Sequence, residues 1–220
     1  MNAAYLDAVT HGIGVAVSPL VIIVLVVMLL SPRATPNSVA FLAGWLAGLL
    51  TLGGAIFALG GFGGLGAGPR LVAGIDIAFG LCLLGLACRS WRRRDHSGGL
   101  PGWLLAADRF SVPQAAAVGG FFAVVYPKNL ILAAAVATEL AALGSHGFIW
   151  TYLLFVGIGS TTIAGPVVLY LAIGFRLQEV LHRAKTALTA HSSAITILLL
   201  IFFGLKLLIQ GVLKSMAAGF

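Results

Sequence analysis

Charged residues are scarce in this sequence: they make up 9% of its 220 residues, whereas 60% of the residues are hydrophobic. A soluble domain is usually about 25% charged, so this chain lacks the polar side chains that would cover a water-facing surface. Its mean hydropathy of +1.08 agrees with this interpretation. We therefore expect an integral membrane protein.

The sequence also lacks the motifs of soluble enzymes. It has no Walker A lysine loop, so ATP-driven transport by this chain alone is not expected. It has no histidine–carboxylate cluster that suggests a metalloenzyme, and we expect no enzyme activity, no cofactor and no metal site. The formal net charge of +7 does not imply a nucleic acid partner, because the cations lie mostly in loops beside apolar runs, where membrane orientation explains them.

Cysteine is nearly absent. The two that occur, Cys82 and Cys88, lie six residues apart in one apolar segment. This spacing fits neither a C-x-x-C redox pair nor a usual zinc site. We expect both to be buried as small apolar residues.

Long apolar runs are what the sequence does contain. A spanning helix needs roughly 20 mainly apolar residues, and six segments qualify: 8–31, 38–63, 71–90, 113–142, 147–174 and 193–215. The fourth is overlong, which suits a broken or tilted helix. A basic linker, residues 91–112, separates a first three-helix unit, residues 1–90, from a second, residues 113–220. We expect an all-α protein with six transmembrane helices.

Lysine and arginine are distributed unevenly over the predicted loops. Nine lie on one side and two on the other, with Lys128 and Lys206 inside apolar segments. The nine are Arg33, Arg89, Arg92, Arg93, Arg94, Arg109, Arg176, Arg183 and Lys185. Because cytoplasmic loops carry the excess of positive charge, we expect a cell-membrane protein with both termini outside. In the linker, LPGWLLAADRF is expected to form either an interfacial helix or a flexible cytoplasmic loop.

The two halves of the chain resemble each other. VSPLVIIV in the first segment and VYPKNLIL in the fourth align so that Val17 and Pro19 match Val125 and Pro127. FLAGWLAG is echoed by LLFVGIGS, and IDIAFGLCLLG by ITILLLIFFG, in the same order. With three helices in each half, the halves must have opposite topology. This is the inverted-repeat plan of many transporters.

A lysine follows a proline in the middle of the fourth apolar segment. Pro19 and Pro127 each interrupt the helical hydrogen-bond ladder, and the helical rise places both near the centre of the bilayer. Paired interrupted helices in transporters mark a substrate site near the midplane. We therefore expect helices 1 and 4 to be broken and Lys128 to face a polar cavity between the repeats. The alternative is that Lys128 only extends toward an interface.

The candidate substrate site consists of residues that adjoin the two breaks: Ser18, Pro19, Tyr126, Pro127, Lys128 and Asn129. The ammonium of Lys128 and the backbone N–H groups at the breaks would attract an anionic head group. Asn129 would orient that group by hydrogen bonding, or would simply cap the second half of the broken helix.

A few other charges also fall within or near the apolar segments. Asp76 and Lys206 lie at similar depths by helical rise, so we expect an ion pair that is either structural or a switch or proton relay. Glu139 is expected at a wet boundary or as a gate. His11 follows Asp7 by one helical turn, which predicts a surface pair or a proton sensor.

Glycines crowd the second apolar segment, among them Gly44, Gly48, Gly53 and Gly54. Small residues allow close packing of helices in lipid, which is the role we expect. Mobility of this helix during transport is the alternative.

The stretch from Gly14 to Leu50 is similar to the start of the actinobacterial GAP family, the glycolipid- and sulfolipid-addressing (Sap) membrane proteins of the lysine-exporter (LysE) superfamily. The shared features are Ser18–Pro19, the triplet Ser31–Pro32–Arg33, AFLAGW from Ala40 to Trp45, and YPKN from Tyr126 to Asn129. The resemblance covers essentially the whole chain. It implies export, or delivery toward the cell surface, of a lipid-linked or amphipathic substrate.

Taken together, the residues and the resemblance predict a secondary-type transporter or flippase for a glycolipid or other amphipathic molecule, whose anionic head group enters the cavity while its acyl tails stay in lipid. Arg33 is a candidate first contact for that head group, or only a positive-inside anchor. Asp76 with Lys206 would bias the conformational change. The expected partners are membrane lipids, the substrate, and a second copy of the chain or a larger export complex.

Two other functions fit the same features. One is export of a small solute, an amino acid or a cation, although the scarcity of carboxylates near the bilayer centre disfavours cations. The other is an accessory role in a larger lipid-export complex. Transport by the purified protein alone would separate the first two functions from the third.

Overall fold

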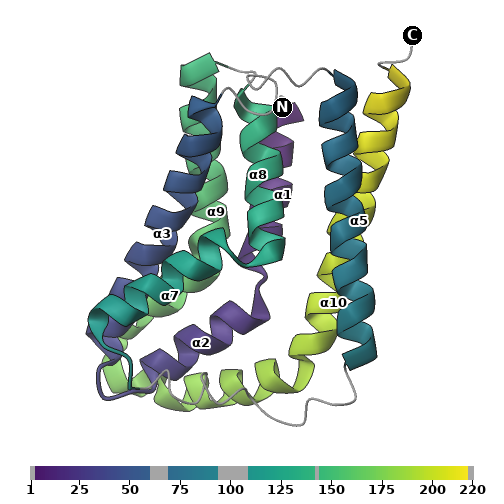
Figure 1. Ribbon diagram of the computed structural model, residues 1–220. Helices are drawn as coiled ribbons and strands as arrows, with labels where there is room; N and C mark the ends of the chain where they lie inside the picture. The colour runs from purple at the N-terminus through teal and green to yellow at the C-terminus, as the bar shows by residue number, and fades with distance from the viewer. Residues whose placement is uncertain (1–2, 60–68, 94–108, 142–143, 218–220) are drawn as a thin grey trace.

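The computed structural model describes residues 3–59, 69–93, 109–141 and 144–217, and these are almost entirely helical, with no strand among them (Figure 1). In chain order the helices are α1 (Ala3–Ala16), α2 (Pro19–Leu29), α3 (Ala34–Ala58), α5 (Pro69–Arg93), α7 (Val112–Val124), α8 (Pro127–Ala141), α9 (Gly144–Ile173), the 3₁₀ turn η3 (Gly174–Leu177) and α10 (Gln178–Ala217). Most of the predicted linker, including the greater part of LPGWLLAADRF, lies outside the described residues.

Four helices are long and apolar enough to span a membrane: α3, α5, α9 and the second half of α10. Two further pairs qualify only together, α1 with α2, bent by 54°, and α7 with α8, bent by 61°. Pro19 and Pro127 are the first residues of α2 and α8, a position at which the missing proline N–H sacrifices no helical hydrogen bond. The breaks predicted at these prolines are therefore confirmed, and the chain has up to six candidate spans.

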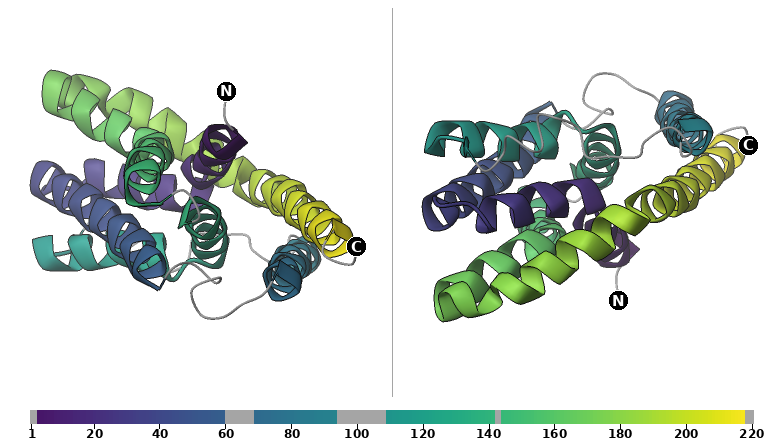
Figure 2. Two further views of the ribbon diagram at one scale, coloured as in Figure 1. Left: turned by 90° about the horizontal axis from the view of Figure 1, so that it is seen from above. Right: turned by 90° about the horizontal axis from the view of Figure 1, so that it is seen from below.

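The helices form a bundle with a separate helix pair beside it (Figures 1 and 2). In the bundle, α3 packs along α7, and α1 packs along α9. Beside it, α5 packs along the second half of α10 over most of its length. The beginning of α1 and the end of α10 lie at the same end of the molecule (Figure 1).

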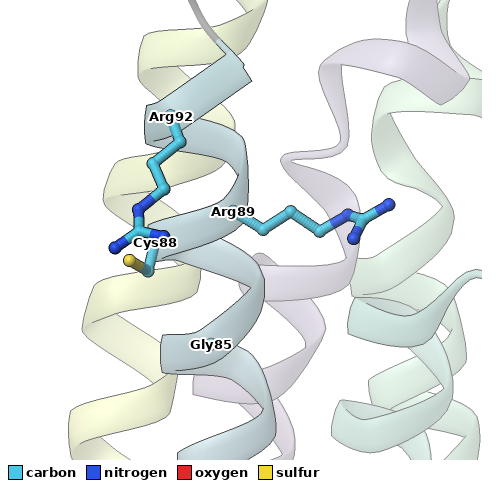
Figure 3. Close-up of a pocket in the computed structure, with 4 residues that line it drawn as sticks. All are labelled: Gly85, Cys88, Arg89 and Arg92. Atoms are coloured by element: carbon cyan, nitrogen blue, oxygen red, sulfur yellow. The ribbon is translucent and has the colours of Figure 1, made fainter.

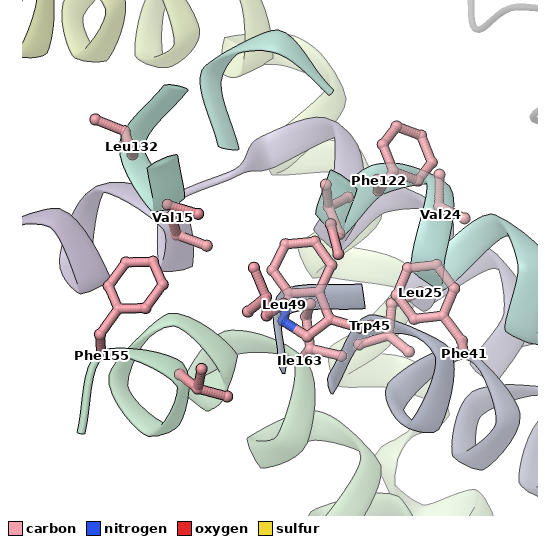
Figure 4. Close-up of a cluster of buried hydrophobic side chains, with 14 of the residues drawn as sticks. Val15, Val24, Leu25, Phe41, Trp45, Leu49, Phe122, Leu132, Phe155 and Ile163 are labelled. Carbon is pink, nitrogen blue, oxygen red and sulfur yellow. The ribbon is translucent and has the colours of Figure 1, made fainter. Parts of the chain in front are cut away.

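The two half-helices that follow the breaks form the centre of the core. In α2 nine of eleven residues are buried, and in α8 every residue from Ile131 to Ala137 is buried. A helix that is apolar all round belongs inside a protein or a membrane. Around them pack large side chains such as Phe41, Trp45 and Phe155 (Figure 4). The indole N–H of Trp45 donates to the hydroxyl of Ser160 at 3.2 Å and thereby joins α3 to α9.

Helix α10 begins much earlier than the sequence predicts. It runs for 40 residues from Gln178, so the stretch 178–192 is helical and not a loop. This stretch contains good helix formers and an i,i+4 ion pair between Glu179 and Arg183, both of which favour a helix. It crosses the end of the bundle at an angle to the second half of α10 (Figure 1), with Leu181 buried and Arg183 exposed. The stretch is more polar than the spans because part of it is exposed at the end of the bundle.

Both cysteines are exposed, so the prediction that they are buried is wrong. Cys82 and Cys88 lie on α5, which packs chiefly against α10 and leaves its other face to the surroundings. In a bilayer an apolar side chain is as stable against lipid as against protein. Hydrophobic character therefore does not predict burial here.

Glycines bring α3 and α7 into backbone contact. A Cβ atom added at Gly44 would overlap the carbonyl group of Ala116, and one at Gly119 would overlap the carbonyl oxygen of Phe41. Gly54, also on α3, has open space where its Cβ would lie. The packing role predicted for the glycines of this segment is confirmed for Gly44.

Replacing Gly44 by alanine is expected to lower the free energy of unfolding by about 1–3 kcal/mol, because the two backbones must separate. The matched variant Gly54→Ala should leave stability unchanged or slightly raised, since alanine is the better helix former. Thermal unfolding of the purified protein in detergent measures both. Equal melting temperatures for the two variants would contradict the close packing of α3 on α7.

Candidate substrate site at the helix breaks

The side chain of Lys128 joins the two breaks. Lys128 lies in the first turn of α8, and its ammonium donates hydrogen bonds to the carbonyl oxygens of Gly14 at 2.5 Å and Val17 at 2.9 Å. Gly14 lies in the last turn of α1 and Val17 directly follows the helix, at an end where a helix has unpaired acceptors and a partial negative charge. The side chain is only 3% exposed. A buried cation is stable here because it meets the end of a helix and not lipid.

Each of the four carbonyl groups at the end of α1, from Gly14 to Val17, has a side-chain donor nearby. Lys128 binds the first and last of the four carbonyls from Gly14 to Val17. The hydroxyl of Ser18 lies 2.7 Å from the second of these carbonyl oxygens, and the hydroxyl of Thr162 donates to the third at 2.7 Å. An unpaired carbonyl in the bilayer would cost several kcal/mol. The break in the first span therefore depends on residues from α8 and α9.

Asn129 connects the second break to the first. Its amide nitrogen donates to the carbonyl oxygen of Phe122 near the end of α7 at 3.1 Å. Its amide oxygen lies 3.2 Å from the hydroxyl of Ser18, which shares its one proton between this oxygen and the backbone. Asn129 is fully buried. Its hydrogen bonds hold the two breaks together, so the amide serves the protein itself.

A cavity of about 220 Å³ lies beside the second break. The described residues that line it are Leu86, Arg89 and Ser90 of α5, Tyr126, Pro127 and Lys128 at the break, and Thr196 and Leu200 of α10. Among them are two cations and no carboxylate. The cavity also adjoins the N-terminus of α8, the positive end of the helix dipole. This combination suits an anion.

The cations of this cavity have binding capacity left over. The ammonium of Lys128 uses two of its three N–H groups on α1, and no described residue takes the third. No described carboxylate lies within ion-pair distance of Arg89. An oxyanion in the cavity would therefore meet donors that are not engaged elsewhere.

The structure separates the predicted substrate-binding residues into three groups. Those that line the cavity are Tyr126, Pro127 and Lys128. Those buried at the junction of the breaks are Ser18, Pro19 and Asn129. Arg33 stands apart, exposed in the turn before α3. That these residues bind a head group stays a prediction.

Sequence reasoning missed Arg89 and Thr196 as members of the site. Arg89 was counted with the loop cations that set orientation, yet it lies inside the candidate span Ala73–Arg92. An arginine within an apolar segment is a signal that could have identified it. Thr196 gives no such signal, because threonine is common in apolar helices.

A second polar cluster lies nearer the chain ends. The ammonium of Lys206 on α10 binds Asp7 of α1 at 2.9 Å. The ammonium of Lys214, also on α10, binds Asp76 of α5 at 2.9 Å and Glu139 of α8 at 3.4 Å. Four helices, α1, α5, α8 and α10, thus meet through charged groups, and α10 is tied to both α1 and α8.

The predicted ion pair between Asp76 and Lys206 is wrong. The packing of α5 on α10 sets the register, and a Cβ at Gly211 would face Ala73 and Ile77. Asp76 is therefore level with the turn around Gly211, beyond Lys206 along α10. The ammonium of Lys206 turns instead toward α1, where Asp7 receives it.

The predicted surface location of His11 is also wrong. The imidazole is fully buried, and its Nδ1 lies 2.8 Å from the backbone carbonyl oxygen of Asp7 and 3.3 Å from the ammonium of Lys206. The ring also lies beside Phe203. Glu139, predicted at a wet boundary, is largely shielded and bound to Lys214, with its side chain 22% exposed.

Replacing Lys128 by methionine is expected to destabilise the protein by about 1–3 kcal/mol, because carbonyls at the end of α1 lose their buried donor. The neighbouring variant Tyr126→Phe is the control, since no described residue hydrogen-bonds to that hydroxyl. Chemical unfolding in detergent compares the two with the wild type. An unchanged stability of Lys128→Met would mean that the ammonium does not hold the break.

The ion-pair partners are distinguished by double-mutant cycles. Asp7→Asn and Lys206→Met should each destabilise the protein, while the double variant should lose about 0.5–3 kcal/mol less than their sum, because the residues interact directly. For Asp76→Asn with Lys206→Met the effects should nearly add. The free energies of unfolding of the variants provide this comparison. Strong coupling in the second cycle and none in the first would refute the observed pairing.

Comparison with known proteins adds one match. The profile of the family described as Sap, sulfolipid-1-addressing protein, matches residues 9–213. This range includes both breaks and every described residue that lines the cavity. Searches of curated proteins and of solved structures gave no match. The chain therefore belongs to the Sap, sulfolipid-1-addressing protein, family.

Proposed function

We propose that the protein is a secondary-type transporter or flippase that moves an anionic amphipathic lipid, such as a glycolipid, toward the cell surface. Membership of the Sap family supports a role in lipid transport. The observation that carries the proposal is the cavity at the beginning of α8 that both Lys128 and Arg89 line. A buried cation such as Lys128 that retains an unused donor is costly unless a ligand meets it.

The chemistry of the cavity favours a phosphate or sulfate ester, or a carboxylate. The guanidinium of Arg89 can hold two oxygens of such a group at once. The remaining N–H of Lys128 and the first N–H groups of α8 supply further donors. At about 220 Å³ the cavity suits a head group and not a whole lipid. The acyl chains would therefore remain in the bilayer during transport.

An inverted repeat of residues 1–90 and 113–220, as in the lysine-exporter superfamily, is part of the proposal. It is supported by the two bent pairs, which break at the matched residues Pro19 and Pro127. Packing supports it too. In the repeat α1 corresponds to α7 and α3 corresponds to α9, so the contact of α1 with α9 has its counterpart in the contact of α7 with α3. Such halves can rock against each other around a central site. Lys128 breaks the symmetry, since its counterpart is Leu20.

The proposed orientation places both termini outside. The turn between α2 and α3, the end of α5 and the beginning of α10 all lie at the end of the molecule opposite the described chain ends (Figure 1). These segments carry Arg33, Arg89, Arg92, Arg176 and Arg183, and clustered cations favour the cytoplasmic side. The cavity would then receive lipid from the cytoplasmic leaflet, which is the direction of export.

The charged cluster near the chain ends would bias the conformational change. Lys206 and Lys214 tie α10 to α1 and α8, so a movement of the α5–α10 pair relative to the bundle must break or exchange these contacts. A partly buried ion pair can be broken at low cost only if each of its charged groups finds another partner of opposite charge. The cluster therefore favours discrete positions of the pair over continuous drift.

The test is flipping of fluorescent anionic and zwitterionic lipid analogues in liposomes, with and without a pH gradient. The wild type should move the anionic analogue faster, and Arg89→Gln should slow it about tenfold or more, since hydrogen bonds to charged groups contribute about 1.5–3 kcal/mol. Lys128→Met should slow it as well. Arg70→Gln, at the other end of α5, is the matched control and should retain the wild-type rate.

Two results would contradict the proposal. One is the absence of flipping by the wild type under every condition, which would favour a small-solute exporter or an accessory subunit. The other is a wild-type rate in Arg89→Gln, which would separate lipid movement from this cavity.

A further inference from the structure

Helix α5 carries a second cavity, of about 590 Å³, on a face that α10 does not cover (Figure 3). The described residues that line it are Gly85, Cys88, Arg89 and Arg92. Their spacing of three, four and seven residues places them on one face of the helix, and all four are exposed. We call this face the α5 groove. Gly85 adds no side chain, and nothing would lie within 4 Å of a Cβ there.

The α5 groove is positively charged, and no described residue neutralises it. No described carboxylate lies within ion-pair distance of Arg89 or Arg92. Both lie in the last two turns of the candidate span Ala73–Arg92, where a spanning helix meets lipid head groups. Two guanidinium groups at this level, neither of them paired with a described carboxylate, attract anionic lipid.

The surroundings of the groove suit the rest of a lipid. One turn further into the span, Leu81 and Cys82 are also exposed. They present an apolar surface that continues the face of Gly85 toward the bilayer centre. A lipid whose head group lay between Arg89 and Arg92 could therefore place an acyl chain along α5.

Arg89 connects the groove to the interior. It lines both the α5 groove and the cavity that contains Lys128. Figure 3 shows its side chain extending away from Arg92 toward the remainder of the protein. Arg92, Arg89 and Lys128 thus form a series of cations from the outer face of α5 to the beginning of α8.

We propose that the α5 groove is a docking site for the phosphate or sulfate head group of a lipid that arrives sideways from the surrounding leaflet. Arg92 and Arg89 bind the head group first, and Arg89 then passes it to the cavity of Lys128. The second step rests on the proposed function, whereas docking in the groove does not. Free phosphate has the same oxyanion chemistry but lacks the acyl chain that would lie along α5, so the experiment tests both sources separately.

Cys88 makes the groove directly measurable. In a Cys82→Ser variant, Cys88 is the only thiol, and an uncharged maleimide should label it more slowly in vesicles that contain phosphatidylglycerol than in phosphatidylcholine alone. The expected slowing is about fivefold for each arginine engaged. Arg92→Gln in the same background should reduce the difference. Inorganic phosphate added to phosphatidylcholine vesicles should give no protection.

The matched control is the Cys88→Ser variant, which leaves Cys82 on the same helix but outside the lining of the groove. Its labelling rate should differ far less between the two vesicles than that of Cys88, because only acyl chains reach Cys82 and both lipids carry them. Equal rates for Cys88 in both vesicles would overturn the docking site, and so would protection by inorganic phosphate alone. Protection of Cys88 without any lipid flipping would uphold the groove and contradict only the proposed function.

Discussion

The hydrogen bonds between Lys128 and the end of α1 are the interaction on which the centre of the protein depends. They allow a helix to stop in the middle of a bilayer without unpaired carbonyls, a condition that lipid imposes on any spanning segment. They also fix α8 against α1. The cavity, the junction at Asn129 and the course of the two buried half-helices all follow from this contact. A residue that looks like a ligand-binding lysine is first a structural one, with one donor left for the cavity.

The polar groups that join α1, α5, α8 and α10 are arranged in two levels. The first contains the breaks, and the second contains the ion pairs of Lys206 and Lys214. Between them, α1 and α8 are apolar. The α5–α10 pair meets the bundle partly through these charges, whereas α3, α7 and α9 pack through glycines and large apolar side chains. Helices α3, α7 and α9 are therefore closely packed, whereas the α5–α10 pair is held to the bundle partly by ion pairs that can exchange partners.

The sequence predicted the spans and the breaks well, because apolar length and proline act locally. It failed where the outcome depended on the register between helices. The partner of Asp76 changed from Lys206 to Lys214 because an offset of about two turns along α10 cannot be read from apolar boundaries. The cysteines were misplaced because lipid and protein interior select the same side chains. Arg89 was assigned to orientation, since only the fold shows that it borders the same cavity as Lys128.

The contact between Lys128 and Gly14 spans 114 positions of the chain. During synthesis the first half enters the membrane well before this lysine is made. The end of α1 must then be hydrated or held by another protein, and α1 and α2 cannot yet adopt their final bend on their own. Completion of the first span is thus delayed until the second half arrives. A nascent chain truncated before Lys128 would expose polar backbone in the bilayer, a feature that quality-control proteases of the membrane can recognise.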